Sequence, residues 1–134
     1  MSFVSATQIL DELIAELADG PSPHERVVDE YVGNIAQEHK GSIVYPMPNR
    51  AIHARADAAV QELRKSWGPT ADPGWANDFL PGRGDRSETA EFDCYFALFR
   101  RESFWGYVRI RAPKTDTPEA AYLRLVFGVA RGTV

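Results

Sequence analysis

Hydrophobic and polar positions alternate most clearly between Phe92 and Ala112, in the stretch FDCYFALFRRESFWGYVRIRA. A polar break at 101–103 divides it into two aromatic-rich segments. A period of two is typical of β-strands, so the stretch predicts an antiparallel hairpin with a three-residue loop at 101–103. An odd loop length keeps each face of the hairpin chemically consistent. A three-residue loop at 101–103 predicts four opposed pairs: Asp93–Arg111, Tyr95–Arg109, Ala97–Tyr107 and Phe99–Trp105.

A second alternating segment follows at Tyr122 to Val129. Leu123, Leu125, Phe127 and Val129 alternate there with Arg124, Val126 and Gly128. The alternation predicts a third strand, which completes a three-stranded antiparallel meander over about residues 89–131. Ser42–Tyr45 is a short apolar run that could add an edge strand, although Pro46 and Pro48 limit its length.

Helical spacing dominates the first half of the chain. Ser5 and Gln8 form a capping box before an apolar stripe that runs to Leu17, and Asp19-Gly20-Pro21 ends this first helix. A second helix is predicted from Ser22-Pro23-His24-Glu25, which has the residue types of an N-terminal cap, to about His39. Its buried side would consist of Val27, Val28, Tyr31, Val32, Ile35 and Ala36.

A third helix is predicted from about Arg50 to Trp67, with Asn49 as its N-cap and Gly68-Pro69 after its end. Residues 68–88 contain many glycines and prolines but also Trp75, Phe79 and Leu80, which favours a loop that packs against the domain. The expected fold class is α+β, in one domain over residues 1–134. Three N-terminal helices at about 5–67 would cover one face of the C-terminal meander.

Composition places the chain among ordinary globular proteins, with 44% hydrophobic and 25% charged residues in 134. The single cysteine, Cys94, excludes an intrachain disulfide and suits a reducing compartment. No apolar run has the length of a membrane span, and the first residues lack the basic start of a signal peptide. These features together predict a cytoplasmic protein with no membrane partner.

Charge is distributed unevenly along the chain, although the net charge is only −4. Residues 1–99 contain 16 Asp or Glu and 8 Lys or Arg, which gives a net charge of −8. Residues 100–134 contain 3 Asp or Glu and 7 Lys or Arg, which gives +4. Such asymmetry can steer a charged partner, and it can equally reflect ion pairs inside the domain. The negative total argues against non-specific binding to nucleic acid.

Residues that could carry out chemistry are scattered. His24, His39 and His53 lack metal-ligand spacing, so neither a metal site nor a cofactor is predicted. Cys94 lies on the predicted core side of its strand, where a thiol is usually a packing residue. The acid pairs Asp11/Glu12, Asp29/Glu30 and Glu91/Asp93 are read as solvated residues and ion pairs, because general acid–base catalysis needs carboxylates that converge on one cleft. No catalytic residue is therefore assigned.

The odd-numbered face of the predicted sheet is the candidate binding surface. It combines aromatic anchors with arginines, types enriched at interface hot spots and suited to base stacking. The candidate residues are Tyr95, Phe99, Trp105, Tyr107, Arg109, Arg111, Tyr122 and Arg124. In the competing interpretation the 69–88 loop covers this face, with Trp75 and Phe79 packed on it.

These observations favour a small acidic, non-catalytic domain that binds another protein. Immunity-type inhibitors of toxic enzymes are also single-domain, disulfide-free and often acidic, which makes them the nearest functional class by analogy. The first alternative is a small enzyme or ligand-binding domain with a pocket between the sheet and the 69–88 loop. The second is a nucleic-acid binder that uses the aromatic and basic sheet face. The sequence names neither the partner nor the oligomeric state.

Overall fold

The computed structural model describes residues 5–18, 20, 22–32, 37–39, 42–44, 47–70, 91–113 and 122–131. Within these ranges the description leaves out the side chains of 37–39, 42–44, 47–50, 91–94, 96, 112 and 113. The predicted packing of Trp75 and Phe79 lies outside the described residues. So do the burial of the Cys94 side chain and the predicted role of Asp19-Gly20-Pro21 in ending the first helix.

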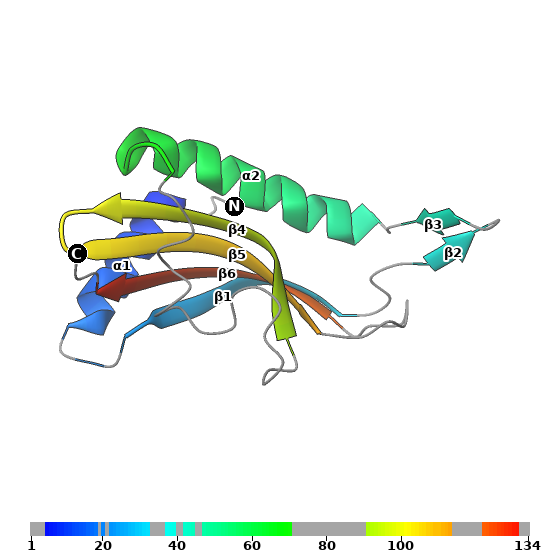
Figure 1. Ribbon diagram of the computed structural model, residues 1–134, viewed down its shortest axis with the longest axis horizontal. Helices are drawn as coiled ribbons and strands as arrows, with labels where there is room; N and C mark the ends of the chain where they lie inside the picture. The colour runs from blue at the N-terminus through cyan, green and yellow to red at the C-terminus, as the bar shows by residue number, and fades with distance from the viewer. Residues whose placement is uncertain are drawn as a thin grey trace.

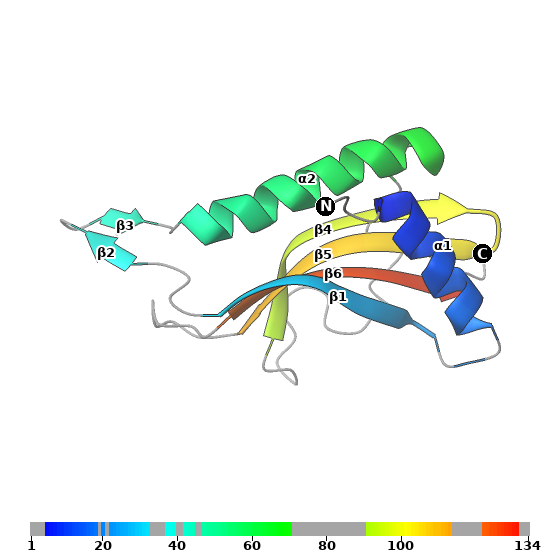
Figure 2. The ribbon, with the colours of Figure 1, turned by 180° about the vertical axis from the view of Figure 1, so that it is seen from behind.

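The described chain forms a four-stranded antiparallel sheet with two helices on one face (Figures 1 and 2). The strand order is β1-β6-β5-β4, so the first strand pairs with the last. The strands span His24–Val32 (β1), Glu91–Arg101 (β4), Phe104–Pro113 (β5) and Tyr122–Arg131 (β6). The helices span Ala6–Leu17 (α1) and Met47–Ser66 (α2). The predicted α+β character is therefore retained, but the predicted arrangement of three helices and three strands is wrong.

The largest correction concerns the predicted second helix, because residues 24–32 form strand β1. Its register against β6 pairs Arg26 with Phe127 and Val32 with Tyr122. The local sequence suits either structure, since Val27, Val28, Tyr31 and Val32 match helical spacing but are also strong strand formers. Pairing with β6 decides between them. The segment after it forms a small hairpin of Gln37–His39 (β2) and Ser42–Val44 (β3).

The strand predicted near 42–45 thus exists, but it pairs with β2 and not with the main sheet. Figure 1 shows this hairpin beyond the end of the sheet, next to the start of α2. Helix α2 begins at Met47 and so includes Asn49, which was predicted to precede it. Pro48 is compatible with this start because the first turn of a helix needs no N–H at that position.

Two local predictions for the first helix are confirmed. The Ser5 side chain caps α1 by accepting a hydrogen bond from the backbone N–H of Gln8 at 3.1 Å. The apolar stripe of α1 is buried against the sheet and α2. At the other end, the Arg131 guanidinium donates to the carbonyl oxygens of Leu17, Ala18 and Gly20. The last strand therefore supplies the cap that the end of α1 requires.

The β4–β5 hairpin has a different register from the predicted one. Arg101 lies opposite Phe104, so the connection contains only Glu102 and Ser103. Phe99 therefore lies opposite Gly106, not Trp105. A register shift between Asp93 and Tyr95 adds one residue to β4 and restores the predicted Asp93–Arg111 pair. The predicted pairs Tyr95–Arg109, Ala97–Tyr107 and Phe99–Trp105 are wrong.

This register determines which side chains enter the core between sheet and helices. On β4 the odd-numbered Tyr95, Ala97 and Phe99 face the helices, whereas on β5 the even-numbered Val108 and Ile110 do so. Leu10 of α1 and Trp67, the residue after α2, approach closely at Gly106, where a Cβ would stand 2.9 Å from Leu10 Cδ1 and 3.0 Å from Trp67 Cζ3. The missing side chain at 106 leaves room for both of these side chains. The side of the sheet opposite α1 and α2 is called the outer face below.

Candidate functional site

The structure divides the eight candidate residues between the two faces of the sheet. Tyr95 and Phe99 pack on the helix side. The opposed pairs of the β-ladders place the other six on the outer face, and these six are Trp105, Tyr107, Arg109, Arg111, Tyr122 and Arg124. The division follows from the two-residue connection in the hairpin, because a shift of one residue moves a strand's side chains to the other face.

Glu25 is the centre of the outer face, although the sequence had suggested a helix-capping role for it. Its carboxylate accepts a hydrogen bond from the Tyr107 hydroxyl at 2.8 Å and forms ion pairs with Arg109 at 2.8 Å and Arg111 at 2.9 Å. The three donors come from β5, whereas Glu25 lies on β1, with β6 between them. The carboxylate therefore joins two strands that are not neighbours.

Gly128 on β6 makes this connection possible. It lies opposite both Tyr107 and Glu25 in the two ladders. A Cβ at position 128 would stand only 2.3 Å from Tyr107 Cζ, so the phenol ring occupies the space above the glycine. The absence of a side chain lets Tyr107 cross β6 and reach Glu25.

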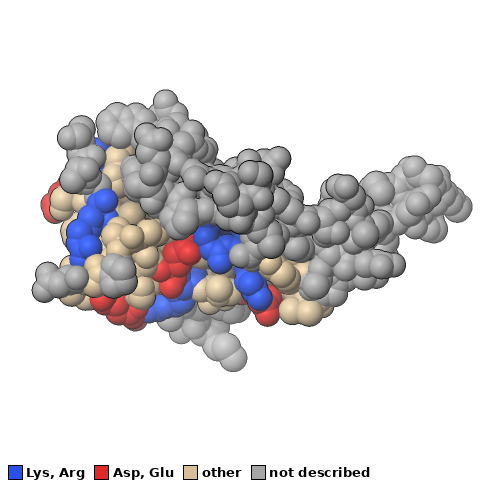
Figure 3. All heavy atoms as spheres, turned by 60° about the horizontal axis from the view of Figure 1, so that its bottom comes forward, with Lys and Arg blue, Asp and Glu red and all other residues tan. Residues whose placement is uncertain are grey.

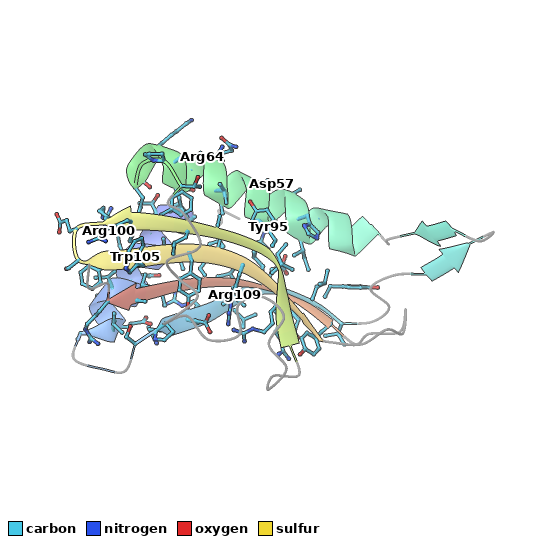
Figure 4. The ribbon with its side chains drawn as sticks, in the orientation of Figure 1. Asp57, Arg64, Tyr95, Arg100, Trp105 and Arg109 are labelled. Atoms are coloured by element: carbon cyan, nitrogen blue, oxygen red, sulfur yellow. The ribbon has the colours of Figure 1, made fainter. Side chains whose placement is uncertain are left out.

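Most of the aromatic and basic centre of the outer face is buried within this chain. Trp105, Tyr107 and Arg109 are exposed by only 2%, 1% and 2%. Arg100 lies over the Trp105 ring at 4.7 Å from its centroid, and Figure 4 shows these two side chains near the same end of the sheet. The covering loop predicted at 69–88 lies outside the described residues, apart from positions 69 and 70. Buried side chains of this kind stabilise the fold and are not presented to a partner.

Exposed apolar residues on the outer face occur along β1. Val27 and Val32 are exposed by 49% and 68%, and they lie opposite Val126 and Tyr122 of β6. Glu30 lies between them and pairs with Arg124, whose guanidinium also stacks on Tyr122 at 4.1 Å from the ring centroid. We call the surface formed by Val27, Glu30, Val32, Tyr122 and Arg124 the β1–β6 strip.

The charges on the described part of the outer face alternate in sign. Figure 3 shows acidic and basic side chains side by side there. The charges concerned are Glu25 with Arg109 and Arg111, and Glu30 with Arg124. A surface that neutralises its own arginines in this way offers less positive potential to a phosphate backbone than the sequence suggested.

A second polar cluster lies on the helix side, between α2 and β4. Asp57 and His53 are one helical turn apart, and the His53 ring contacts Tyr95 edge-on at 6.4 Å between centroids. Figure 4 shows Tyr95 beneath the part of α2 that carries Asp57. Burial raises the pKa of Tyr95, and the charge and hydrogen bond of the Asp57 carboxylate raise it further. The phenol therefore stays protonated and ties α2 to the edge strand β4.

Four further carboxylates form ion pairs that tie elements together. Asp11 pairs with Arg101, Glu12 and Glu16 with Arg26, and Asp29 with Arg55. His24 also contacts Glu16, at 2.9 Å. The adjacent acids Asp11/Glu12 and Asp29/Glu30 thus bond to different partners, as expected from side chains that point in different directions. The side chains of Glu91 and Asp93 lie outside the description. Within the described ranges, no three metal-binding side chains come together.

A groove of about 380 Å³ opens on the helix side, between α1, α2, β1 and β6. The pocket predicted between the sheet and the 69–88 loop lies outside the described residues. Glu62 lines the groove and accepts hydrogen bonds from the backbone N–H groups of Ala6 at 3.2 Å and Thr7 at 2.7 Å. Burial acts to raise the pKa of Glu62, but hydrogen bonds from the Thr7 side chain, from the backbone N–H groups of Thr7 and Ala6 and from the Ser5 side chain together lower it.

Sequence reasoning missed Glu25, Val27, Val32 and Gly128 because it placed the first three in a helix and gave the glycine no role. The available signal was the concentration of Val and Tyr at 27–32, which is typical of a strand. The role of Gly128 depends on Tyr107, which lies beside it on the neighbouring strand, and only the strand register shows this.

The sequence matches no protein-family model, and no curated protein or solved structure is significantly similar to it. Neither α1 nor α2, the two helices in the described part of the chain, has the length and apolar character needed to cross a membrane.

Proposed function

We propose that this chain is a non-catalytic domain that binds another protein through the β1–β6 strip. The observation that supports this is the exposure of Val27 and Val32, at 49% and 68%, on the same face of one edge strand. They are the large apolar side chains that lie exposed among the described residues. Exposed apolar positions that lie together, beside polar residues, are typical of interaction sites.

The other residues of the strip suit a protein partner. Tyr122 and Arg124 belong to the types that contribute most to interface hot spots. The contact between them, at 4.1 Å, holds the guanidinium over the ring. The ion pair of Arg124 with Glu30 lies between the exposed valines and would form the polar part of the interface. A partner would thus meet apolar and charged groups in alternation.

An immunity-type inhibitor is the functional class that we assign within this proposal. Such proteins are single-domain, disulfide-free and often acidic, and this chain has 134 residues, a single cysteine and a net charge of −4. A cytoplasmic location belongs to the same proposal, because a lone thiol suits a reducing compartment. The analogy rests on size and charge and specifies no partner. The protein encoded beside this chain is the partner to test first.

The test is a binding titration between the purified chain and the purified product of the adjacent gene. We expect a 1:1 complex, and we expect Val32→Asp to weaken it by roughly tenfold or more, which is about 1.4 kcal/mol. Ala54→Asp is the matched control, because Ala54 is exposed on α2 and lies away from the strip. Equal affinity of the wild type and Val32→Asp, with both folded, would exclude the strip as the interface.

Binding to nucleic acid is the weaker alternative. Glu25 and Glu30 each pair with arginines on the outer face, and this reduces the charge available for phosphate contacts. Trp105 and Tyr107 are also buried, which keeps their rings from stacking on bases. An affinity for single-stranded oligonucleotides that falls steeply with salt would favour this alternative over a protein partner.

A further inference from the structure

The groove on the helix side has an apolar interior and a polar rim. Its apolar lining comes from four elements: Ala6 and Ile9 of α1, Ala58 and Ala59 of α2, Val28 of β1, and Leu125 and Phe127 of β6. Ser5, Arg55 and Glu62 provide its polar lining. Its volume of about 380 Å³ falls within the range of small-molecule sites in proteins. The groove is thus large enough for a ligand with a short apolar body.

Small side chains create the groove. The two helices contribute alanines at positions 6, 58 and 59, which leave space between α1 and α2 above the sheet. Leu125 and Phe127 alternate toward the helices along β6 and form its floor. Val28 lies at the register shift between Val27 and Asp29 and adds a further apolar wall. The interior therefore consists of aliphatic and aromatic carbon.

The charged groups of the groove are already balanced. Glu62 accepts the backbone N–H groups at the start of α1, where the helix dipole favours a negative charge. Arg55 donates to Asp29 at 2.6 Å. Arg55 is thus neutralised by Asp29, and the Glu62 charge is met by hydrogen bonds and the helix dipole, so both lining charges already have partners within the chain. A charged ligand would lose its hydration without gaining an unpaired opposite charge in the lining, a cost that a neutral ligand avoids.

We propose that this groove binds an uncharged amphipathic small molecule with a short apolar body and one hydroxyl or amide head. The apolar body lies against Ile9, Leu125 and Phe127, and the head forms hydrogen bonds at the rim that contains Ser5, Arg55 and Glu62. This site is on the opposite side of the sheet from the β1–β6 strip. Protein binding and ligand binding are therefore independent, and either can fail without the other.

The experiment compares three six-carbon compounds whose polar heads are neutral, negative and positive: 1-hexanol, hexanoate and hexylammonium. Each is titrated into the ¹⁵N-labelled protein, and amide chemical shifts are followed. We expect saturable binding of 1-hexanol, roughly fivefold or more tighter than either charged compound, because only the neutral head avoids an uncompensated desolvation cost. Tighter binding of hexanoate or hexylammonium, or the absence of saturation, would overturn the proposal.

A matched pair of variants locates the site. Ala58 is exposed and lines the groove, so Ala58→Leu fills it and should weaken 1-hexanol binding by about tenfold. Ala54 is exposed one turn earlier on α2 and does not line the groove, so Ala54→Leu should bind like the wild type. Equal effects of the two variants would overturn the assignment.

A measurement on the unaltered protein keeps the test independent of how the variants fold. Nuclear Overhauser effects should connect the methylene protons of 1-hexanol to the side chains of Ile9, Leu125 and Phe127. Contacts found only with residues outside the groove would place the ligand elsewhere and contradict the proposal.

Discussion

The ring of Tyr107 lies directly over Gly128 on the neighbouring strand, so close that a Cβ at position 128 would stand 2.3 Å from Tyr107 Cζ. This relationship lets the Tyr107 hydroxyl reach Glu25, one strand further on. Two strands separated by a third are thus joined by a side chain that crosses a glycine. The hydrogen bond between Tyr107 and Glu25 on the outer face depends on this crossing.

Gly128→Ala should destabilise the protein by about 1–3 kcal/mol, because the added methyl displaces the Tyr107 ring and strains the surrounding packing. Urea denaturation would measure the change. Its origin can be checked in a Tyr107→Ala background, where the same substitution at 128 should cost clearly less. Additive effects of the two changes would show that the ring is not what the methyl meets.

Glu25→Ala should reduce the free energy of unfolding by about 2–4 kcal/mol, since it removes the carboxylate that pairs with Arg109 inside the protein. Glu30→Ala is the matched control on the same strand. Its pair with Arg124 is more exposed to solvent, so the loss should be below about 1 kcal/mol. Chemical denaturation of both variants measures the difference, and equal losses would contradict a central role for Glu25.

Glu62→Gln should destabilise the protein by about 0.5–2 kcal/mol at neutral pH, because the carboxylate accepts two backbone N–H groups at the start of α1. The pKa of Glu62 is lowered by folding, so its contribution is complete above the ordinary value of 4.5. The contribution decreases as the pH falls through the lower pKa of the folded state. Chemical denaturation of the wild type and Glu62→Gln, from neutral pH into acid, should show their free energies of unfolding converge in acid. A stability difference between them that grows in acid would refute the assignment.

Trp105→Ala should lower the free energy of unfolding by about 3–5 kcal/mol, as expected for the loss of a large buried aromatic side chain. A direct role of this residue in partner binding would instead give a small stability change and a large loss of affinity. A thermal melt and a binding titration on the same variant separate the two. The burial of Trp105 leads us to expect the stability effect.

Local signals in the sequence were sufficient to place several elements. The cap at Ser5 and the stripe after it predicted α1, because those contacts lie within one or two turns of the chain. Alternation predicted strands near 92–112 and 122–131, since the two faces of a strand meet different surroundings. Of the candidate surface, the sequence identified Tyr122 and Arg124, which remain in the β1–β6 strip that we propose.

The tertiary structure decided what depends on partners distant in the chain. Residues 24–32 match both helical and strand patterns, and pairing with β6, about a hundred residues later, selects the strand. A two-residue connection and a shift beside Cys94 set the hairpin register, which moves Tyr95 and Phe99 to the helix side. Glu25 meets Tyr107 and Arg109 only because these strands assemble around Gly128. Local sequence fixes periodicity and capping, whereas register and burial depend on contacts that form only in the assembled sheet.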